Sequence, residues 1–449
     1  MPLSVAELQP ALHDLFTGAA DQLARDAGFT RRARKLTGPA FAQALVFSFL
    51  GCPDATLDDF AEAAAELGAA VSPQAFDRRF TPQAADFLRG LLRAAFDRSF
   101  NSLRPALLPL LCRFRGVFLR DATLVGLPQA LAEAFPGRGG RHAAHGQAAA
   151  CKLVVEAEVT TGQLTELSVL AGLANERTAA VAGKPLPAGA LLLEDTGFFS
   201  GARLQGYSEQ GVYVLTRVPA RTAFFDRRGR RLDLLKELRR AKGGRLDRPV
   251  RILHGTRLAV RLLAVRLPEA EARQRRARVR REARQRGRAA GRRKLELCAW
   301  NVLVTNAPRR LLGLGEACAV RRVRWQIELV FKVFKSEGHI DRARSRCPCR
   351  VLCELFAKLL AQVVRQWALP AAGYRMPRHS ARRAARRVRR RAGRLLRALG
   401  SLGALGREIA ALAVALHRRC RVVRRRASPS TLDRLSALDP AFDPARPAA

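Results

Sequence analysis

The chain lacks any apolar run of the length that a membrane-spanning helix requires. None of its 449 residues belongs to a stretch approaching the roughly 20 consecutive apolar residues of a bilayer span. The N-terminal segment also lacks the basic residues followed by an apolar core that mark a secretory signal. Its nine cysteines are an odd number without framework spacing, which argues against a disulfide scaffold. We therefore expect a cytoplasmic protein with reduced thiols.

Acidic residues and lysine are both scarce. Only 38 residues are Asp or Glu against 81 that are Lys or Arg, so the formal net charge is +43, and only nine of the 81 are Lys. The skew toward Arg, with abundant Ala, Gly and Pro, is typical of a GC-rich genome, which explains part of the Arg excess. A charge of this sign still requires a polyanionic counterpart, and nucleic acid fits best. A hydrophobic content of 48% excludes a disordered chain.

Three regions are predicted in a chain long enough for two or three domains. Residues 1–112 are predicted to be helical throughout. Within them, Ser72 as N-cap and Pro73 in the first turn begin a helix that carries Arg78 and follows a turn at Gly68. This arrangement is typical of a helix-turn-helix, which would make the region DNA-binding. An ordinary helical hairpin fits the same pattern equally well.

Residues 113–370 change to a mixed pattern of strands and helices. Short apolar strands are predicted at 117–121 and 190–195, each ending in an acid. A hairpin is predicted at 152–171, because Thr161-Gly162 separates two strand-like segments. Strands and helices in this order predict a mixed α/β layer.

Two further segments differ from this core. Residues 220–298 break the pattern, with short strand candidates followed by an Arg-dense helix from 269 to 293, and are predicted to be a β-rich insertion. Residues 371–449 are predicted to be an Arg-rich helical region, with seven Arg residues between positions 382 and 391. The predicted fold class is therefore α/β, with a helical N-terminal region and a basic helical C-terminus.

Two acids follow predicted central strands. Asp121 and Asp195 both stand at the carboxyl end of a strand, and the functional groups of an open α/β sheet gather at that edge. If the strands are neighbours, the two carboxylates lie close together, which is unfavourable unless a divalent cation neutralises them. Glu194 is a rival for Asp195, but strand alternation places it on the opposite face, and Asp195 is nearer to the strand's exit. Each acid could also be an ordinary turn residue.

A helix that runs through residues 321–335 is predicted to carry one narrow polar stripe. At about 100° per residue, the stripe combines one carboxylate, Glu328, with four cations, and almost every other side of the helix is apolar. A helix of that kind is buried, so the stripe is predicted to line a cleft. Glu328 would complete a cage of three carboxylates for two hard cations such as Mg²⁺, whereas a salt-bridged helix face is the alternative. The four cations are Arg321, Arg324, Lys332 and Lys335.

Together these motifs resemble a DDE transposase of bacterial insertion-sequence family four. The resemblance rests on the strand ending at Asp121, the segment that begins at Asp195, and the stripe around Glu328. That family has a signature of Tyr, two residues, Arg, three residues, Glu, six residues and Lys. Arg321 stands where the family has Tyr. The other signature positions match at Arg324, Glu328 and Lys335.

The resemblance implies an RNase H-like mixed sheet and a metal-dependent reaction. Enzymes of this family cleave DNA at transposon ends and transfer the 3′-hydroxyl into target DNA. The expected partners are therefore double-stranded DNA with terminal inverted repeats, target DNA, and a second copy of the chain in a synaptic homodimer. Two Mg²⁺ ions, for which Mn²⁺ can substitute, would be held by Asp121, Asp195 and Glu328. The resemblance also implies that the protein acts in the cytoplasm of a bacterium, associated with the nucleoid.

The same resemblance assigns contacts to DNA. Trp300 or Trp325 would stack on an extruded base, although core packing is the commoner role of a tryptophan. Two other functions fit the sequence: a metal-dependent nuclease without strand transfer, and an inactive DNA-binding protein descended from a transposase. The phosphate contacts would come from Arg321, Arg324, Lys332 and Lys335.

Overall fold

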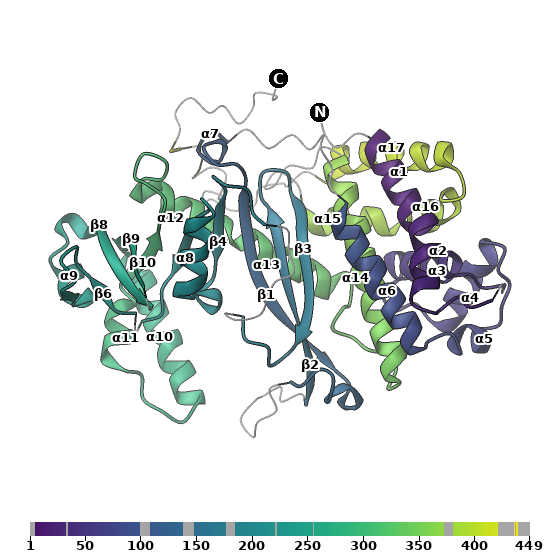
Figure 1. Cartoon of the computed structure of the whole chain (residues 1–449), viewed down its shortest axis with the longest axis horizontal. Helices are drawn as coiled ribbons and strands as arrows, with labels where there is room; N and C mark the ends of the chain where they lie inside the picture. The colour runs from purple at the N-terminus through teal and green to yellow at the C-terminus, as the bar shows by residue number, and fades with distance from the viewer. Residues whose placement is uncertain are drawn as a thin grey trace.

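The described residues form a ten-stranded mixed sheet, which runs from a helical body at one end to a smaller extension built on its last strands (Figure 1). The strand order is β3-β2-β1-β4-β5-β10-β9-β8-β6-β7. The structure is a computed structural model, and the coarse prediction of a mixed α/β fold is confirmed. It describes residues 5–32, 35–98, 108–137, 148–176, 185–220, 222–254, 256–371, 380–420, 435 and 437–438.

Five strands form the half of the sheet next to the helical body. β1 lies between an antiparallel neighbour, β2, and a parallel one, β4, and β5 continues the parallel side. β2 and β3 form the predicted hairpin, whose turn has Gly162 at a φ of +76°, a conformation that favours glycine. The strands are β1 (Val117–Leu127), β2 (Ala149–Glu158), β3 (Gln163–Ala171), β4 (Leu191–Glu194) and β5 (Tyr213–Arg217).

The prediction that β1 ends at Asp121 is wrong. β1 continues to Leu127, because β2 pairs with it from Glu158 to Ala149. Only the pairing with the shorter β4 stops, at Arg120. Asp121 therefore lies in the middle of a strand, at the point where its parallel neighbour ends.

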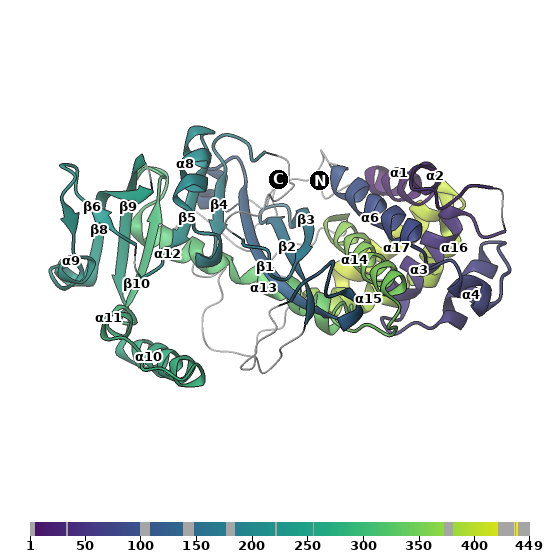
Figure 2. The same ribbon diagram turned by 60° about the horizontal axis from the view of Figure 1, so that its bottom comes forward.

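The predicted insertion extends the same sheet. β8 and β9 form a long antiparallel hairpin, and β10 joins β9 to β5. Figure 2 shows α10 and α11 projecting from this end of the sheet. The elements are β6 (Phe224–Phe225), β7 (Arg231–Leu232), α9 (Leu234–Arg239), β8 (Arg245–His254), β9 (Thr256–Arg266), α10 (Glu269–Gln285), α11 (Arg292–Leu297) and β10 (Trp300–Thr305).

Helices from both ends of the chain form one helical body. α14 packs on α3 and α6, and α17 packs on α1, so the helices that the sequence assigned to separate N-terminal and C-terminal regions share a core. No helix in the described ranges has the length and apolar character needed to cross a membrane. The elements are α1 (Val5–Phe16), α2 (Gly18–Asp26), α3 (Gly38–Gly51), α4 (Leu57–Glu66), α5 (Pro73–Asp77), α6 (Pro82–Asp97), α7 (Pro109–Cys112), α14 (Pro348–Ala371), α15 (Ala381–Arg389), α16 (Ala392–Ala398) and α17 (Leu402–Arg419).

The segment compared with a helix-turn-helix comprises α4 and α5. The Ser72 hydroxyl accepts a hydrogen bond from the Ala75 backbone N–H at 3.1 Å, so the predicted helix start is confirmed. α5 has only five residues. Arg79 turns inward, with its guanidinium 4.0 Å from the centre of the Phe29 ring. Gln74 and Asp77 are the exposed polar residues of this short helix, and Arg78 is exposed at its C-cap.

The two faces of the sheet pack against different helices. Leu119, Leu193 and Leu215 belong to the main core, which includes residues of α12 (Leu314–Val323) and α13 (Trp325–Ser336). Alternate residues such as Leu192 belong to a second core with α8 (Gly201–Glu209). Alternation along each strand therefore decides which helices a given side chain meets.

Candidate active site

One row of residues crosses the three parallel strands on the side of α12 and α13. The pairing of β1, β4 and β5 ends at the row that contains Glu194. One position further along the strands are Asp121, Asp195 and Arg217, which we call the acid row. By alternation these residues share a face with Leu193, whose neighbours include the apolar side chains of α12 and α13.

α12 and α13 are separated at Arg324, which is the residue between them. The Arg324 guanidinium donates from Nη1 to Asp121 Oδ2 at 2.5 Å and from Nη2 to Glu328 Oε1 at 2.6 Å. One turn earlier, Arg321 Nη2 donates to Asp195 Oδ1 at 3.0 Å. Each of the three predicted acids, which come from β1, the end of β4 and α13, is therefore paired with one of two arginines a turn apart.

The three carboxylates influence one another electrostatically. Burial raises the pKa of Asp121, and the negative charges of Asp195 and Glu328 raise it further. The charge of Arg324 and the Ala122 backbone N–H oppose this rise without cancelling it. A carboxylate in such surroundings favours any added cation.

Arg321 is buried, with only 7% of its surface exposed. Burial, together with the charges of Arg324 and Arg217, lowers its pKa to about 10. Its Nε, like that of Arg324, has no hydrogen-bond partner among the described atoms. These guanidiniums therefore retain unused donors beside the acids, which a bound anion could accept.

Arg217 is a site residue that the sequence analysis missed. Burial lowers its pKa, as does the charge of Arg275, while Asp195 acts in the opposite direction. The signal was present, since Arg217 closes the strand predicted after Asp195. The parallel register that places it beside Asp195 is visible only in the assembled sheet.

Of the remaining predicted residues, three lie on α13 and one, Trp300, lies on β10. Lys335 Nζ donates to the Leu124 carbonyl at 3.0 Å, which holds it against β1. Lys332 lies 4.7 Å above the ring of Trp325, and that tryptophan is 49% exposed rather than packed in the core. Trp300 starts β10 and is partly buried against the second core, with no described contact to the three acids.

Comparison with known proteins decides the family. The family model described as Transposase DDE domain matches residues 113–364, more than half of the chain and all the residues of the acid row. This chain belongs to the DDE transposases.

Its relatives are transposases of insertion sequences. The transposase for insertion sequence element IS231F of Bacillus thuringiensis subsp. israelensis is 25% identical over 386 residues, covering 80% of each chain. The transposase for element IS1151 of Clostridium perfringens is 22% identical over 364 residues, covering 76% of each chain. Among solved structures, the piggyBac transposase synaptic complex with hairpin DNA matches weakly, with a TM-score of 0.46 and 8% identity over 96% of this chain and 88% of that one.

The opposite face of the transposase sheet holds a second set of charges. Glu194 accepts hydrogen bonds from Arg120 at 2.9 Å and from Arg203 at 3.1 Å, and Arg120 also donates to Glu156 at 2.5 Å. We call Glu156, Arg120 and Glu194 the buried row. Glu194 is only 3% exposed, whereas the Asp195 side chain is 42% exposed. Of these two neighbouring acids, only Asp195 is accessible from outside.

The acids of the transposase have the ligand chemistry of a Mg²⁺ site, since carboxylate oxygens are hard ligands. Within the described ranges, however, no three His, Cys, Asp or Glu side chains lie close enough together to hold one ion. Arg324 is bonded to both Asp121 and Glu328. These bonds occupy one oxygen of Asp121 and one of Glu328, so the donor types match a hard cation although the three carboxylates are not gathered around one point.

Proposed function

We propose that this transposase cuts double-stranded DNA at the ends of an insertion sequence and joins the freed 3′-hydroxyl to target DNA. The observation that carries the proposal is the pairing of Asp121 and Glu328 with Arg324 and of Asp195 with Arg321, one turn away. Membership of the DDE transposases supports the same reaction. We also propose an RNase H-like fold, which is supported by the order β3-β2-β1-β4-β5 with Asp121 on its central strand.

We assign Asp121, Asp195 and Glu328 as the residues that hold two Mg²⁺ ions, with Mn²⁺ as a substitute. Bound there, the ions would supply the positive charge that activates the attacking oxygen and stabilises the leaving one. Arg324 gives up its bonds to Asp121 and Glu328 and turns its guanidinium toward a DNA phosphate. Arg321 stays on Asp195 and orients that carboxylate.

The chain's other residues position the DNA. In cleavage, water attacks a phosphorus atom at the transposon end and displaces the 3′-oxygen, which becomes a free 3′-hydroxyl. In transfer, that hydroxyl attacks a target phosphorus and displaces a 3′-oxygen of the target strand. Arg217 lies beside Asp195 in the acid row, and Lys332 and Lys335 lie one and two turns beyond Glu328 on α13. These three residues are assigned to the flanking phosphates. Exposed Trp325, with Lys332 over its ring, is assigned to stack on an unpaired base.

The partners follow from this reaction. Double-stranded DNA with terminal inverted repeats is the first substrate, and target DNA is the second. Two copies of the chain bring two ends together in a synaptic homodimer. The proposed location is the cytoplasm of a bacterium, at the nucleoid.

A strand-transfer assay tests the proposal. The full-length protein is incubated with Mg²⁺, an unlabelled plasmid, and a 5′-labelled duplex taken from the DNA that flanks its gene. We expect a shortened labelled strand from cleavage, and a labelled plasmid when pre-cut ends are supplied. Cleavage without joining would identify a nuclease, and DNA binding without either product would identify an inactive relative. Asp121→Asn is the control that should bind DNA and produce neither.

A further inference from the structure

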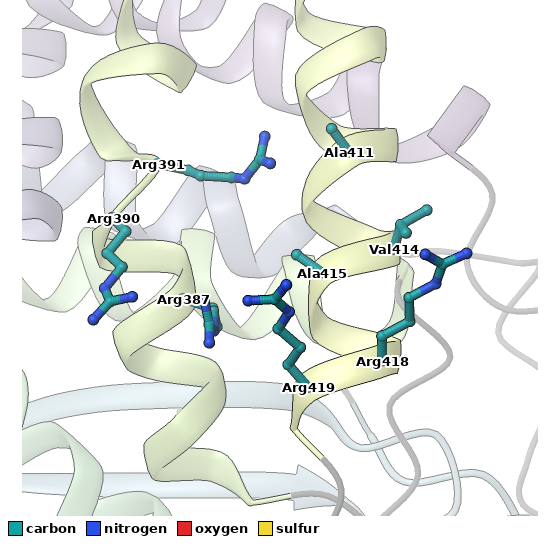
Figure 3. Close-up of a pocket in the computed structure, with 8 residues that line it drawn as sticks. All are labelled: Arg387, Arg390, Arg391, Ala411, Val414, Ala415, Arg418 and Arg419. Atoms are coloured by element: carbon teal, nitrogen blue, oxygen red, sulfur yellow. The ribbon is translucent and has the colours of Figure 1, made fainter.

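A cavity of about 370 Å³ lies between α15 and α17 and is bordered mainly by arginines (Figure 3). Figure 3 shows Arg387, Arg391 and Arg419 directed into the space between the two helices. We call this space the arginine cleft. The residues that define it are Arg387, Arg390, Arg391, Arg418, Arg419 and Val414.

Among the residues that the structure describes, four of the five arginines have no acidic partner. Arg391 donates to Glu408 at 2.9 Å. The guanidiniums of Arg387, Arg390, Arg418 and Arg419 form no ion pair with any described residue. Guanidiniums gathered in this way repel one another, so the cleft favours an anion that several of them can share.

The arginines of α15 are divided between two roles. On one side of the helix, Arg382, Arg386 and Arg389 all pair with Glu337, at 2.9, 3.4 and 3.2 Å. On another side, Arg387 borders the cleft. Genome composition alone would not separate partnered from unpartnered arginines by helix face, so the unpartnered set calls for an external ligand.

We propose that the arginine cleft binds backbone phosphates of double-stranded DNA at a site separate from the carboxylates. The inference rests on the proposed function, because a DNA substrate supplies the phosphates. The side-chain forks of Arg387 and Arg419 match phosphate oxygens in geometry as well as charge. The exposed, apolar Val414 (53% exposed) offers a contact for a sugar edge between two phosphates.

The cleft is joined to the acids through one helix. Glu337, which pairs with three arginines of α15, is the C-cap residue of α13. Glu328 lies in the first turn of the same helix. Nine residues of helix separate these two positions, or about 14 Å along its axis. A duplex bound in the cleft is therefore held at a constant offset from Glu328, which sets where along the DNA the acids act.

The test compares two charge-matched double variants of the full chain. Arg387→Gln with Arg419→Gln removes two cleft arginines. Arg240→Gln with Arg394→Gln removes two exposed arginines outside the cleft. Affinity for a labelled duplex is measured by fluorescence anisotropy across a salt series. We expect the cleft variant to bind roughly 10- to 50-fold more weakly near 0.1 M salt, with a salt slope smaller by about 2, while the control changes little.

Two results would overturn the proposal, and a third calls for another variant. Equal losses in both double variants would mean that only total charge matters. Normal DNA binding by the cleft variant, with loss of the thermal stabilisation that inorganic pyrophosphate gives the wild type, would identify a small-anion site. A cleft variant with a lower melting temperature than the control would be replaced by Val414→Asp, which must weaken DNA binding for the proposal to stand.

The proposed function can fail separately from the cleft. A wild-type chain that binds the duplex with cleft-dependent affinity but never cuts it would refute the enzyme and keep the cleft. A wild-type chain that cuts DNA while the cleft variant binds it normally would refute the cleft and keep the enzyme. A wild-type chain that does not bind duplex DNA would refute both.

Discussion

The acid row and the buried row lie one residue apart on β1 and β4, yet they differ in their surroundings. Both combine carboxylates with arginines. The buried row faces α8, where Glu194 is almost fully enclosed and bonded to two arginines. The acid row faces α12 and α13, where Asp195 remains partly open and has one arginine partner. The same chemical groups therefore stabilise the sheet on one face and form the candidate active site on the other.

Burial explains why neighbouring acids take such different roles. Burial raises the pKa of Glu194, although Arg120 and Arg203 act against this rise. A charge in that position is useful only to the fold, since no ligand can reach it. Asp195 retains access to solvent, so its carboxylate can accept a further cation while Arg321 remains bonded to it. Single substitutions separate the role of stabilising the fold from the role of acting on DNA.

Asp195→Asn should abolish DNA cleavage, with a loss of about 10³-fold or more, because the proposed metal site contributes several kcal/mol. Its free energy of unfolding should fall by about 1–3 kcal/mol, because the buried Arg321 loses its charged partner while the new amide oxygen can still accept its hydrogen bond. Initial cleavage rates and urea denaturation measure the two effects. Cleavage near the wild-type rate would remove Asp195 from the active site.

Glu194→Gln should show the opposite pattern. Removal of a buried charge leaves Arg120 and Arg203 short of a partner, which destabilises the fold by about 3–5 kcal/mol. Urea denaturation measures this loss, and cleavage below the unfolding transition should survive. A stable Glu194→Gln protein without cleavage would mean that the roles of the two adjacent acids are reversed.

Glu337→Gln should lower the free energy of unfolding by about 1.5–3 kcal/mol at pH 7, since hydrogen bonds to a charged group are lost. Burial tends to raise the pKa of Glu337, but the Arg382 hydrogen bond and the charges of Arg389 and Arg386 lower it below its ordinary 4.5. A depressed folded-state pKa stabilises the protein above pH 4.5, and that stability is lost as the pH falls further. The difference between wild type and variant should therefore shrink below pH 4.5. A pH-independent difference would contradict this account.

Arg217→Gln should lower the cleavage rate at saturating DNA by about tenfold, the loss expected for roughly 1.4 kcal/mol of phosphate contact. Mn²⁺ binding, followed by paramagnetic resonance, should be unchanged because a guanidinium offers no lone pair to a metal. Arg240→Gln is the matched control for charge. An Arg217→Gln protein that cuts at the wild-type rate would show that the third member of the acid row is a bystander.

Local sequence patterns were enough to predict several parts of the site. The hairpin at Gly162 and the helix start at Ser72 are confirmed, because each depends on residues next to one another in the chain. Asp195 and Glu194 were assigned to opposite faces from alternation alone, and the structure places them so. The polar stripe also predicted that Arg324 and Glu328 would share a helix face, and they are bonded to each other.

Other parts depended on contacts between distant segments. β1 passes Asp121 because β2 continues to pair with it, which the strand's own residues do not reveal. Arg217 joins the acid row only through the parallel register of β4 and β5. The sequence predicted Arg324 as a contact to a DNA phosphate. Its bridge between Asp121 and Glu328 depends on β1 lying beside α13, which the sequence did not predict.

The sequence by itself determined the class of elements, the family signature and the excess of positive charge, because these depend on composition and on short-range spacing. Only the tertiary structure decided which charges are engaged and which are free. Arg386 and Arg387 are neighbours on α15, yet one is paired with Glu337 and the other borders the arginine cleft. A side chain's partners come from segments tens or hundreds of residues away, so burial and pairing are properties of the assembled fold.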